Sequence, residues 1–253
     1  MDPTAYEVVH ELEEAHWFFV ARRRILTRLL DDLMTGVSGT SILDVGCGTG
    51  ATMSLLERYG EVTGIDISSK ALAYCQEQGR SRLCLADGQS IPFSDGSFDL
   101  VTALDLLEHL EREDAGLREA WRVLKNGGYA VLVVPAYQFL WSGFDEFSGH
   151  FRRYTREELK RVVEAVGFEV TKLSYFNTVL FPIVWGVRTM KTLLGRRVSS
   201  SSDLATPGGG LNVVLARVFS AENHLISRTD LPFGVSLLCI ARKWSARRGS
   251  DEI

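Results

Sequence analysis

A short run of glycines after an apolar segment constrains the fold of this chain more than any other feature. Residues 42–50 read ILDVGCGTG, so the apolar segment ends at Asp44, and Gly46, Gly48 and Gly50 follow at alternate positions. Glycine is needed where the backbone must turn sharply and come close to a ligand. We therefore expect a strand, a ligand-binding loop and a helix, in that order.

Two further carboxylates favour a nucleoside as the ligand of this loop. Asp66 lies 20 residues beyond the first glycine, where an acidic side chain can accept hydrogen bonds from ribose hydroxyls. Asp87 ends a third predicted strand and suits an adenine amino group, although a lone aspartate there also serves as a turn former. The third glycine falls one residue earlier than in the NAD-binding pattern, and Asp44 would repel a pyrophosphate but attract an ammonium group. NAD stays as the alternative ligand.

Strand-like and helix-like segments alternate along the chain, which predicts a parallel sheet with crossover helices. Strands are expected at residues 41–45, 61–65, 82–86, 98–104, 129–134, 168–176 and 234–241. Helices are expected at residues 7–34, as one long or broken helix, and at 51–59, 69–78, 112–124, 155–166, 179–194 and 211–226. Asn126-Gly127-Gly128 is expected to end the helix before the fifth strand.

This order of elements predicts one domain over residues 1–253. Its parts are an N-terminal helical lid (1–36), a cofactor-binding core (37–176), a helical insertion (177–232) and a final strand (233–243). Within the insertion, the Ser/Gly-rich segment 196–210 is expected to be a mobile linker.

Composition and charge exclude several classes of protein. With 28 basic and 32 acidic residues, the chain has no overall field to attract a nucleic acid. Its four cysteines form no C-x-x-C pair, which fits a reducing compartment better than disulfides or a zinc site, so we expect no metal site. The acidic segment 1–14 does not resemble a signal peptide, and the apolar run 178–187 is too short to cross a bilayer. A cytoplasmic protein is expected.

Five motifs between residues 41 and 135 resemble those of class I S-adenosylmethionine-dependent methyltransferases. They read ILDVGCGTG, GID, LADGQSIPF, FDLVTALDLLEHL and LKNGGYAVLVVP, in the order and spacing of that family. The resemblance implies an α/β fold with a doubly wound, Rossmann-like sheet. Its seven strands would be mostly parallel, with the last antiparallel and a helical insertion between strands six and seven. It also implies S-adenosyl-L-methionine as cofactor and S-adenosyl-L-homocysteine as product.

The cofactor site predicted from these motifs lies at the carboxyl ends of the first strands. HWFFVAR at residues 16–22 also resembles an aromatic-plus-arginine lid, in which an arginine pairs with the cofactor carboxylate. The alternative for Arg22 is a surface residue in the basic cluster 22–24. The predicted cofactor-binding residues are Arg22, Asp44, Gly46, Gly48, Gly50, Asp66, Ile67, Asp87, Gly88 and Leu104.

Candidate catalytic residues follow the fourth and fifth strands. Methyl transfer from a sulfonium requires alignment of the acceptor and, for a hydroxyl acceptor, a general base. His150 is the preferred base, with Asp105 and His109 as further candidates. The alternatives are that His150 caps or packs beside the following helix and that His109 is an exposed residue. Other polar groups nearby are Glu108, Asp145, Arg152, Arg153 and Tyr154.

Arg152 and Arg153 suit either a clamp on an acceptor carboxylate or phosphate, or solvated charges at the entry of a helix.

Aromatic residues between 139 and 151 indicate an apolar acceptor pocket, or simply core packing. The segment 178–197 combines an apolar helix with a basic end. It is typical of a lid over a lipid-like acceptor, a peripheral contact with the inner face of the membrane, or a subunit interface. We expect a monomer or a homodimer.

These patterns predict methyl transfer to a small-molecule or lipid-linked acceptor, with a hydroxyl oxygen as the favoured target. The alternative is a catalytically silent accessory protein that binds S-adenosylmethionine. A nucleic-acid methyltransferase is disfavoured because Asp105-Leu-Leu-Glu stands where base-modifying relatives carry an Asn/Asp-Pro-Pro-aromatic motif.

Overall fold

The computed structural model describes residues 3–37, 39–193 and 208–244. Most of the predicted linker 196–210 lies outside these ranges, so its expected mobility stays a prediction.

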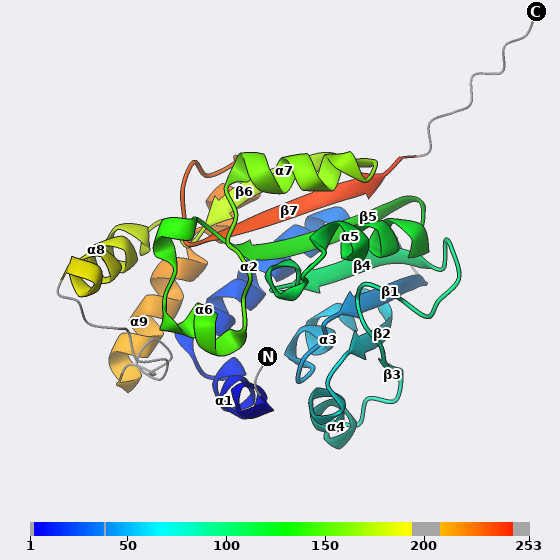
Figure 1. Ribbon diagram of the computed structural model, residues 1–253, viewed down its shortest axis with the longest axis horizontal. Coiled ribbons are helices and arrows are strands. Elements are labelled where there is room, and N and C mark those ends of the chain that lie inside the picture. The colour runs from blue at the N-terminus through cyan, green and yellow to red at the C-terminus, as the bar shows by residue number, and fades with distance from the viewer. Residues whose placement is uncertain (1–2, 38, 194–207, 245–253) are drawn as a thin grey trace, which may run out of the picture.

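Seven strands form one mixed sheet with the order β3-β2-β1-β4-β5-β7-β6, in which only β7 runs antiparallel to its neighbours (Figure 1). The strands are β1 (Thr40–Val45), β2 (Gly60–Asp66), β3 (Leu83–Leu85), β4 (Phe98–Leu104), β5 (Leu124–Pro135), β6 (Phe168–Phe176) and β7 (Ser236–Lys243). The predicted Rossmann-like sheet with an antiparallel last strand is confirmed.

Most helices match predicted segments, but α6 was not predicted and the predicted helix 211–226 is divided into α9 and α10. They are α1 (Pro3–Glu13), α2 (Trp17–Leu33), α3 (Ala51–Leu56), α4 (Ser69–Glu77), α5 (Glu113–Val123), α6 (Gly143–Ser148), α7 (Arg156–Ala165), α8 (Phe181–Leu193), α9 (Gly209–Ser220) and α10 (Asn223–Ile226). The predicted segment 7–34 is broken into α1 and α2, because His16 caps the second helix by accepting from the backbone N–H of Phe18.

One turn prediction was wrong. Asn126-Gly127-Gly128 does not lie between a helix and a strand but inside β5, which begins at Leu124. The pairing with β4 shifts here, since Phe98 faces Leu124 whereas Leu100 faces Tyr129. Gly127 has a φ of 84°, a conformation that glycine adopts without strain, so the three residues form a bulge within the strand.

Side chains alternate along the central strands, and both faces of the sheet are therefore covered. Leu43, Val101 and Leu132 belong to the core beneath α5 and α7. Ile42 and Leu100 belong to the opposite core, which contacts α2, α3, α9 and α10. This three-layer arrangement buries both faces of the sheet, as a largely parallel sheet requires.

The parallel strands end at one edge of the sheet, and the functional loops gather there. In Figure 1, α1, α6, α8 and α9 lie at this end of the molecule. No helix in the described ranges is long and apolar enough to cross a membrane.

Gly60 at the start of β2 gives a test of this packing. A Cβ atom there would lie 2.1 Å from the backbone oxygen of Thr40. We expect Gly60→Ala to lower the free energy of unfolding by about 1–3 kcal/mol, as measured by urea denaturation. Gly186→Ala is the matched control, because a Cβ there meets open space on α8, and it should leave stability equal or raised by up to about 1 kcal/mol. Equal effects of the two variants would contradict the close approach of β1 and β2.

Candidate functional site

The glycine loop turns sharply between β1 and α3. Gly46, Gly48 and Gly50 have φ angles of 71°, 55° and 95°, which disfavour any residue with a side chain. The backbone N–H groups of Gly46 and Cys47 both donate to the carbonyl of Ile65, at 2.8 and 3.0 Å. The loop is therefore anchored to the end of β2, and its three predicted glycines are required by its conformation.

Asp66 lies under this loop at the end of β2 and is almost fully buried. Its carboxylate accepts hydrogen bonds from the backbone N–H of Gly48 at 3.0 Å and of Ser68 at 2.8 Å. The Tyr6 hydroxyl of α1 also donates to it, at 3.3 Å. Ile67, the next residue, is by contrast 71% exposed beside the same loop.

Asp44 is a buried carboxylate with one unpaired oxygen. The Thr102 hydroxyl donates to its Oδ1 at 2.6 Å, whereas Oδ2 has no hydrogen-bond partner. Burial raises the pKa of Asp44 to about 7, and the nearby Asp66 acts in the same direction, against the Thr102 hydrogen bond and Arg22. A cationic group beside Oδ2 would satisfy the oxygen and favour the charged form.

Asp87 and Gly88 lie in the turn after β3. Asp87 accepts from the backbone N–H of Gln89 at 2.8 Å, so the turn-forming role considered for it is present. Gly88 packs closely on the end of β1, because a Cβ there would lie 3.0 Å from a methyl carbon of Val45.

Arg22 lies inside the molecule, so the alternative of a surface arginine was wrong. Its side chain is 12% exposed and forms an ion pair with Asp105, the residue that follows β4. The guanidinium carbon also lies 5.6 and 5.3 Å from the ring centroids of Phe18 and Phe19. These contacts tie α2 to the carboxyl end of β4, next to Leu104.

α1 covers the glycine loop. The Thr49 hydroxyl donates to the buried carboxylate of Glu13, and Lys70 pairs with Glu7. Together with the bond from Tyr6 to Asp66, these contacts place α1 over the loop, and its role as a lid stays a prediction.

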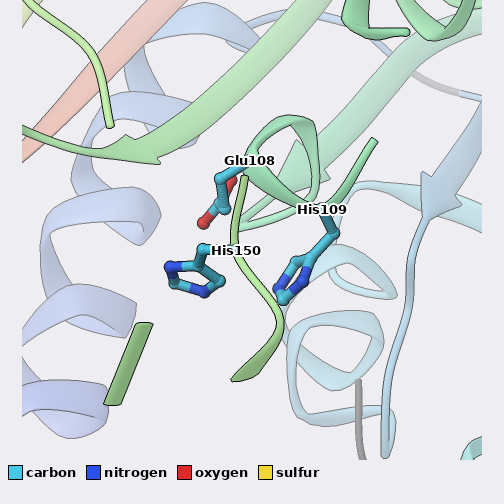
Figure 2. A group of neighbouring side chains, drawn as sticks. All are labelled: Glu108, His109 and His150. Atoms are coloured by element: carbon cyan, nitrogen blue, oxygen red, sulfur yellow. The ribbon is translucent and has the colours of Figure 1, made fainter. Parts of the chain in front are cut away.

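Three titratable side chains meet beyond the end of β4. Glu108 and His109 belong to the short 3-10 helix η1 (Leu107–His109), and His150 follows α6. Figure 2 shows the three side chains directed toward a common space. The rings of His109 and His150 stand edge to face, with centroids 4.6 Å apart. Asp105 lies at the start of the segment that carries Glu108. The predicted catalytic residues Asp105, His109 and His150 therefore occupy one region.

His150 is held by a buried carboxylate. Its Nδ1 lies 2.8 Å from Oδ1 of Asp145, which is fully buried on α6. Burial alone would raise the pKa of Asp145, but His150 and Arg153 outweigh it and hold that pKa well below its usual value. The histidine therefore contacts the preceding helix, and the Asp145 bond orients its ring.

Glu108 is buried and His109 is partly buried, and both have polar atoms without a partner. Glu108 is 0% exposed, and neither of its carboxylate oxygens has a hydrogen-bond partner. Burial raises the pKa of Glu108 well above its usual value, with a contribution from Asp105. Nδ1 of His109 also lacks a partner, and burial together with His150 lowers the pKa of His109 to about 3. The alternative of an exposed His109 was therefore wrong.

The two arginines before α7 have partners within the protein. Arg153 is buried and binds Asp145 through Nε and Nη2, at 2.8 and 2.9 Å. Arg152 pairs with Glu113 at 3.0 Å. Arg153 is thus neither a solvated charge nor a free clamp, because its guanidinium lies against Asp145.

Aromatic side chains line the adjoining surface after β5. Tyr137 stacks on Tyr175 and on Phe139, with centroids 5.0 and 4.9 Å apart. Phe181 of α8 lies 5.7 Å from Tyr137, and Phe139 is 59% exposed. This arrangement forms an apolar surface beside α8 rather than a closed core.

Glu108 and Asp145 are among the polar groups noted in the sequence, where neither has a predicted role. Ser142 and Asp145 form a capping box, with the Ser142 backbone N–H donating to Asp145 at 2.8 Å. That spacing is readable in the sequence and could have marked Asp145 as structural. No comparable local signal marks Glu108 as buried.

Comparisons with known proteins show which proteins this chain is similar to. A family model described as a methyltransferase domain matches residues 43–132. A demethylmenaquinone methyltransferase of Staphylococcus aureus is 32% identical over 173 residues, which cover 55% of this chain and 72% of the relative. An O-methyltransferase of Aspergillus nomiae is 33% identical over 111 residues. That match covers 40% of this chain and about half (49%) of the relative.

A solved structure shows the same fold. It is a phosphoethanolamine N-methyltransferase of Haemonchus contortus in complex with phosphomonomethylethanolamine and S-adenosylhomocysteine. The identity is 17%, the TM-score is 0.62, and the match covers 97% of this chain and 59% of the other.

The Asp145–Arg153 pair predicts a large difference between adjacent arginines. Arg153→Met leaves the Asp145 carboxylate buried without its guanidinium partner, so we expect a loss of about 3–5 kcal/mol in the free energy of unfolding. Arg152→Met removes a more exposed ion pair and should cost less than about 1 kcal/mol. Urea denaturation of both variants measures the difference, and comparable losses would contradict a structural role confined to Arg153.

Proposed function

Because this chain belongs to the class I S-adenosylmethionine-dependent methyltransferases, we propose that it methylates a hydroxyl oxygen of a small-molecule or lipid-linked acceptor. The methyl donor is S-adenosyl-L-methionine. The observation that carries the assignment of its site is the unpaired, buried Oδ2 of Asp44 beside a glycine loop.

The residues around the loop fit this cofactor. We assign the methionine ammonium to Asp44, because a buried carboxylate with a free oxygen favours a neighbouring cation. Asp66 suits the ribose hydroxyls, which would take the place of the Tyr6 hydroxyl. The exposed side chain of Ile67 can pack on the adenine ring, and the Asp87 carboxylate can accept from its amino group.

Arg22 is assigned to the cofactor carboxylate. A guanidinium offers five N–H donors, so the ion pair with Asp105 leaves others for a second carboxylate. Gly46, Gly88 and Leu104 complete the predicted contact surface. A side chain is disfavoured at both glycines, because a Cβ atom would crowd Leu106 at position 46 and Val45 at position 88.

The apolar surface at the carboxyl edge supports an apolar acceptor. Phe139 and, on α8, Ile183 and Trp185 are each more than half exposed. Exposed apolar groups of this size suit a ligand or lipid contact. One relative is named an O-methyltransferase, which supports an oxygen target. Another is named a demethylmenaquinone methyltransferase, which supports a quinone-like acceptor.

We assign removal of the acceptor proton to a general base, either His150 or Asp105. Asp145 orients the His150 ring through Nδ1, which leaves Nε2 available toward an acceptor hydroxyl. His109 is a poor base in this structure because its pKa is lowered to about 3. The methyl group passes in line from the donor sulfur to the acceptor oxygen, and S-adenosyl-L-homocysteine leaves.

The pKa of Asp44 predicts a pH-dependent affinity for the cofactor. Below pH 7 the raised pKa leaves Asp44 largely neutral, so the cofactor ammonium loses its partner. We expect the Kd for S-adenosylmethionine, measured by calorimetry, to rise about tenfold between pH 7.5 and pH 6. Asp44→Asn should bind at least about tenfold more weakly at pH 7.5 and lose this pH dependence. Asp99→Asn is the matched control, and a flat profile in the wild-type protein would contradict the assignment.

The acceptor class is tested with methyl-labelled S-adenosylmethionine. The purified protein is incubated with the labelled donor and an extract of its source cells, and organic-soluble products are separated from aqueous products. We expect label in the organic phase, reduced severalfold by Trp185→Ser but not by Trp244→Ser, a similarly exposed tryptophan after β7.

Label confined to aqueous products would overturn the lipid-linked acceptor. Tight binding of the donor with no labelled product in either phase would instead favour the catalytically silent accessory protein.

A further inference from the structure

We propose that Glu108, His109 and His150 bind one divalent first-row transition-metal ion. One carboxylate oxygen and one nitrogen from each ring all lie within 4.8 Å of one another. Figure 2 shows that the two histidines and the glutamate converge from η1 and from the loop after α6.

The unpaired atoms of this cluster indicate that it binds a ligand. Both oxygens of Glu108 are fully buried without a hydrogen-bond partner, and Nδ1 of His109 is in the same situation. A buried carboxyl group without a partner costs free energy, and such groups in native proteins are normally bonded to protein, water or an ion. A metal ion would satisfy Glu108 and His109 together, which a single hydrogen-bond donor could not do.

His150 carries the accompanying interaction expected of a metal-binding histidine. Its Nδ1 lies 2.8 Å from the Asp145 carboxylate, so its Nε2 remains for a ligand. Histidines that bind metals usually hold a carboxylate or carbonyl with the other ring nitrogen, which sets the ring orientation and increases the basicity of the ligand atom. Asp145 is a positioning residue in this arrangement, itself held by Arg153 and Ser142.

The donor set indicates the kind of ion. Two imidazoles and one carboxylate suit Zn²⁺, Fe²⁺, Mn²⁺ or Co²⁺, whereas Mg²⁺ and Ca²⁺ prefer oxygen ligands alone. Three protein ligands also leave coordination positions open, as in catalytic rather than structural sites. Ligand atoms of one such ion stand about 3–3.5 Å apart, so binding would draw the three side chains closer by side-chain rotation.

The charges around the cluster are compatible with a cation. Burial raises the pKa of Glu108, the neighbouring carboxylates of Asp105 and Asp145 raise it further, and Arg153 lowers it. A divalent ion would relieve the repulsion among these carboxylates.

The location links the ion to methyl transfer, and this link alone rests on the proposed function. The cluster follows β4 at the edge of the sheet where the acceptor is expected. A metal ion lowers the pKa of a bound hydroxyl, which then loses its proton to solvent before its oxygen attacks the donor methyl group. Coordination by Nε2 of His150 would exclude that nitrogen as a general base, so the ion would replace the imidazole in promoting proton loss.

The test is a metal titration of the full chain without donor or acceptor. Protein stripped with a chelator is titrated with Co²⁺, followed by visible absorption and calorimetry, and Zn²⁺ is then used to displace the bound Co²⁺. We expect one ion per chain with a Kd of about 1 μM or tighter. Glu108→Gln and His150→Gln should each weaken binding at least about tenfold, and Asp145→Asn by about 10–100-fold.

Matched controls separate the site from adventitious binding. Glu111→Gln and His224→Asn alter an exposed glutamate and an exposed histidine outside the cluster, and both should bind Co²⁺ as the wild-type protein does. Because Asp145→Asn also removes the partner of Arg153, thermal denaturation is recorded for every variant, and Glu108→Gln, which removes no hydrogen bond of the folded protein, carries the conclusion.

Failure of the wild-type protein to bind one equivalent of Co²⁺ or Zn²⁺ would overturn the proposal, as would unchanged binding by Glu108→Gln. S-adenosylmethionine binding is measured on the same samples. If it persists while no metal binds, the metal site fails and the proposed methyltransferase, with His150 as base, stands.

Discussion

Parallel pairing of β1 with β2 and β4 is the constraint on which the rest of this structure depends. Because Asp44 pairs with Gly64 and Thr102, the ends of three strands come to one edge in register. Residues separated by some 20 to 60 positions in sequence thereby share one site. The buried faces of the sheet supply the stability, which leaves the loops at this edge free to adopt conformations required by ligands rather than by packing.

This arrangement leaves two buried carboxyl groups with oxygens that have no hydrogen-bond partner. Asp44 and Glu108 are both buried at the carboxyl edge with unpaired oxygens, and burial raises the pKa of each. Asp145 is equally buried but has full partners, and its pKa is lowered. The contrast distinguishes a carboxylate that stabilises the fold from two for which ligands are proposed, a cationic cofactor group at Asp44 and a metal ion at Glu108.

Much of the fold and of the cofactor loop could be predicted from the sequence because those signals are local. The spacing of Gly46, Gly48 and Gly50 reflects backbone angles, and strand hydrophobicity reflects burial on both faces. The burial and pairing of Arg153 and Glu108 depend instead on contacts with residues that are brought together only by folding. For the same reason Asn126-Gly127-Gly128 was misplaced: its composition indicates a turn, but strand pairing with β4 converts it into a bulge.

Contacts of the two N-terminal helices lie where the cofactor is proposed to bind. Tyr6 donates to Asp66, and Arg22 pairs with Asp105, so α1 and α2 occupy polar groups assigned to the cofactor. A ribose must displace the Tyr6 hydroxyl, whereas Arg22 can keep Asp105 while it binds a second carboxylate. Cofactor binding would then loosen one contact of α1 and strengthen the attachment of α2. The second effect joins the donor site to Asp105, three residues before Glu108, and so to the region where the acceptor is expected.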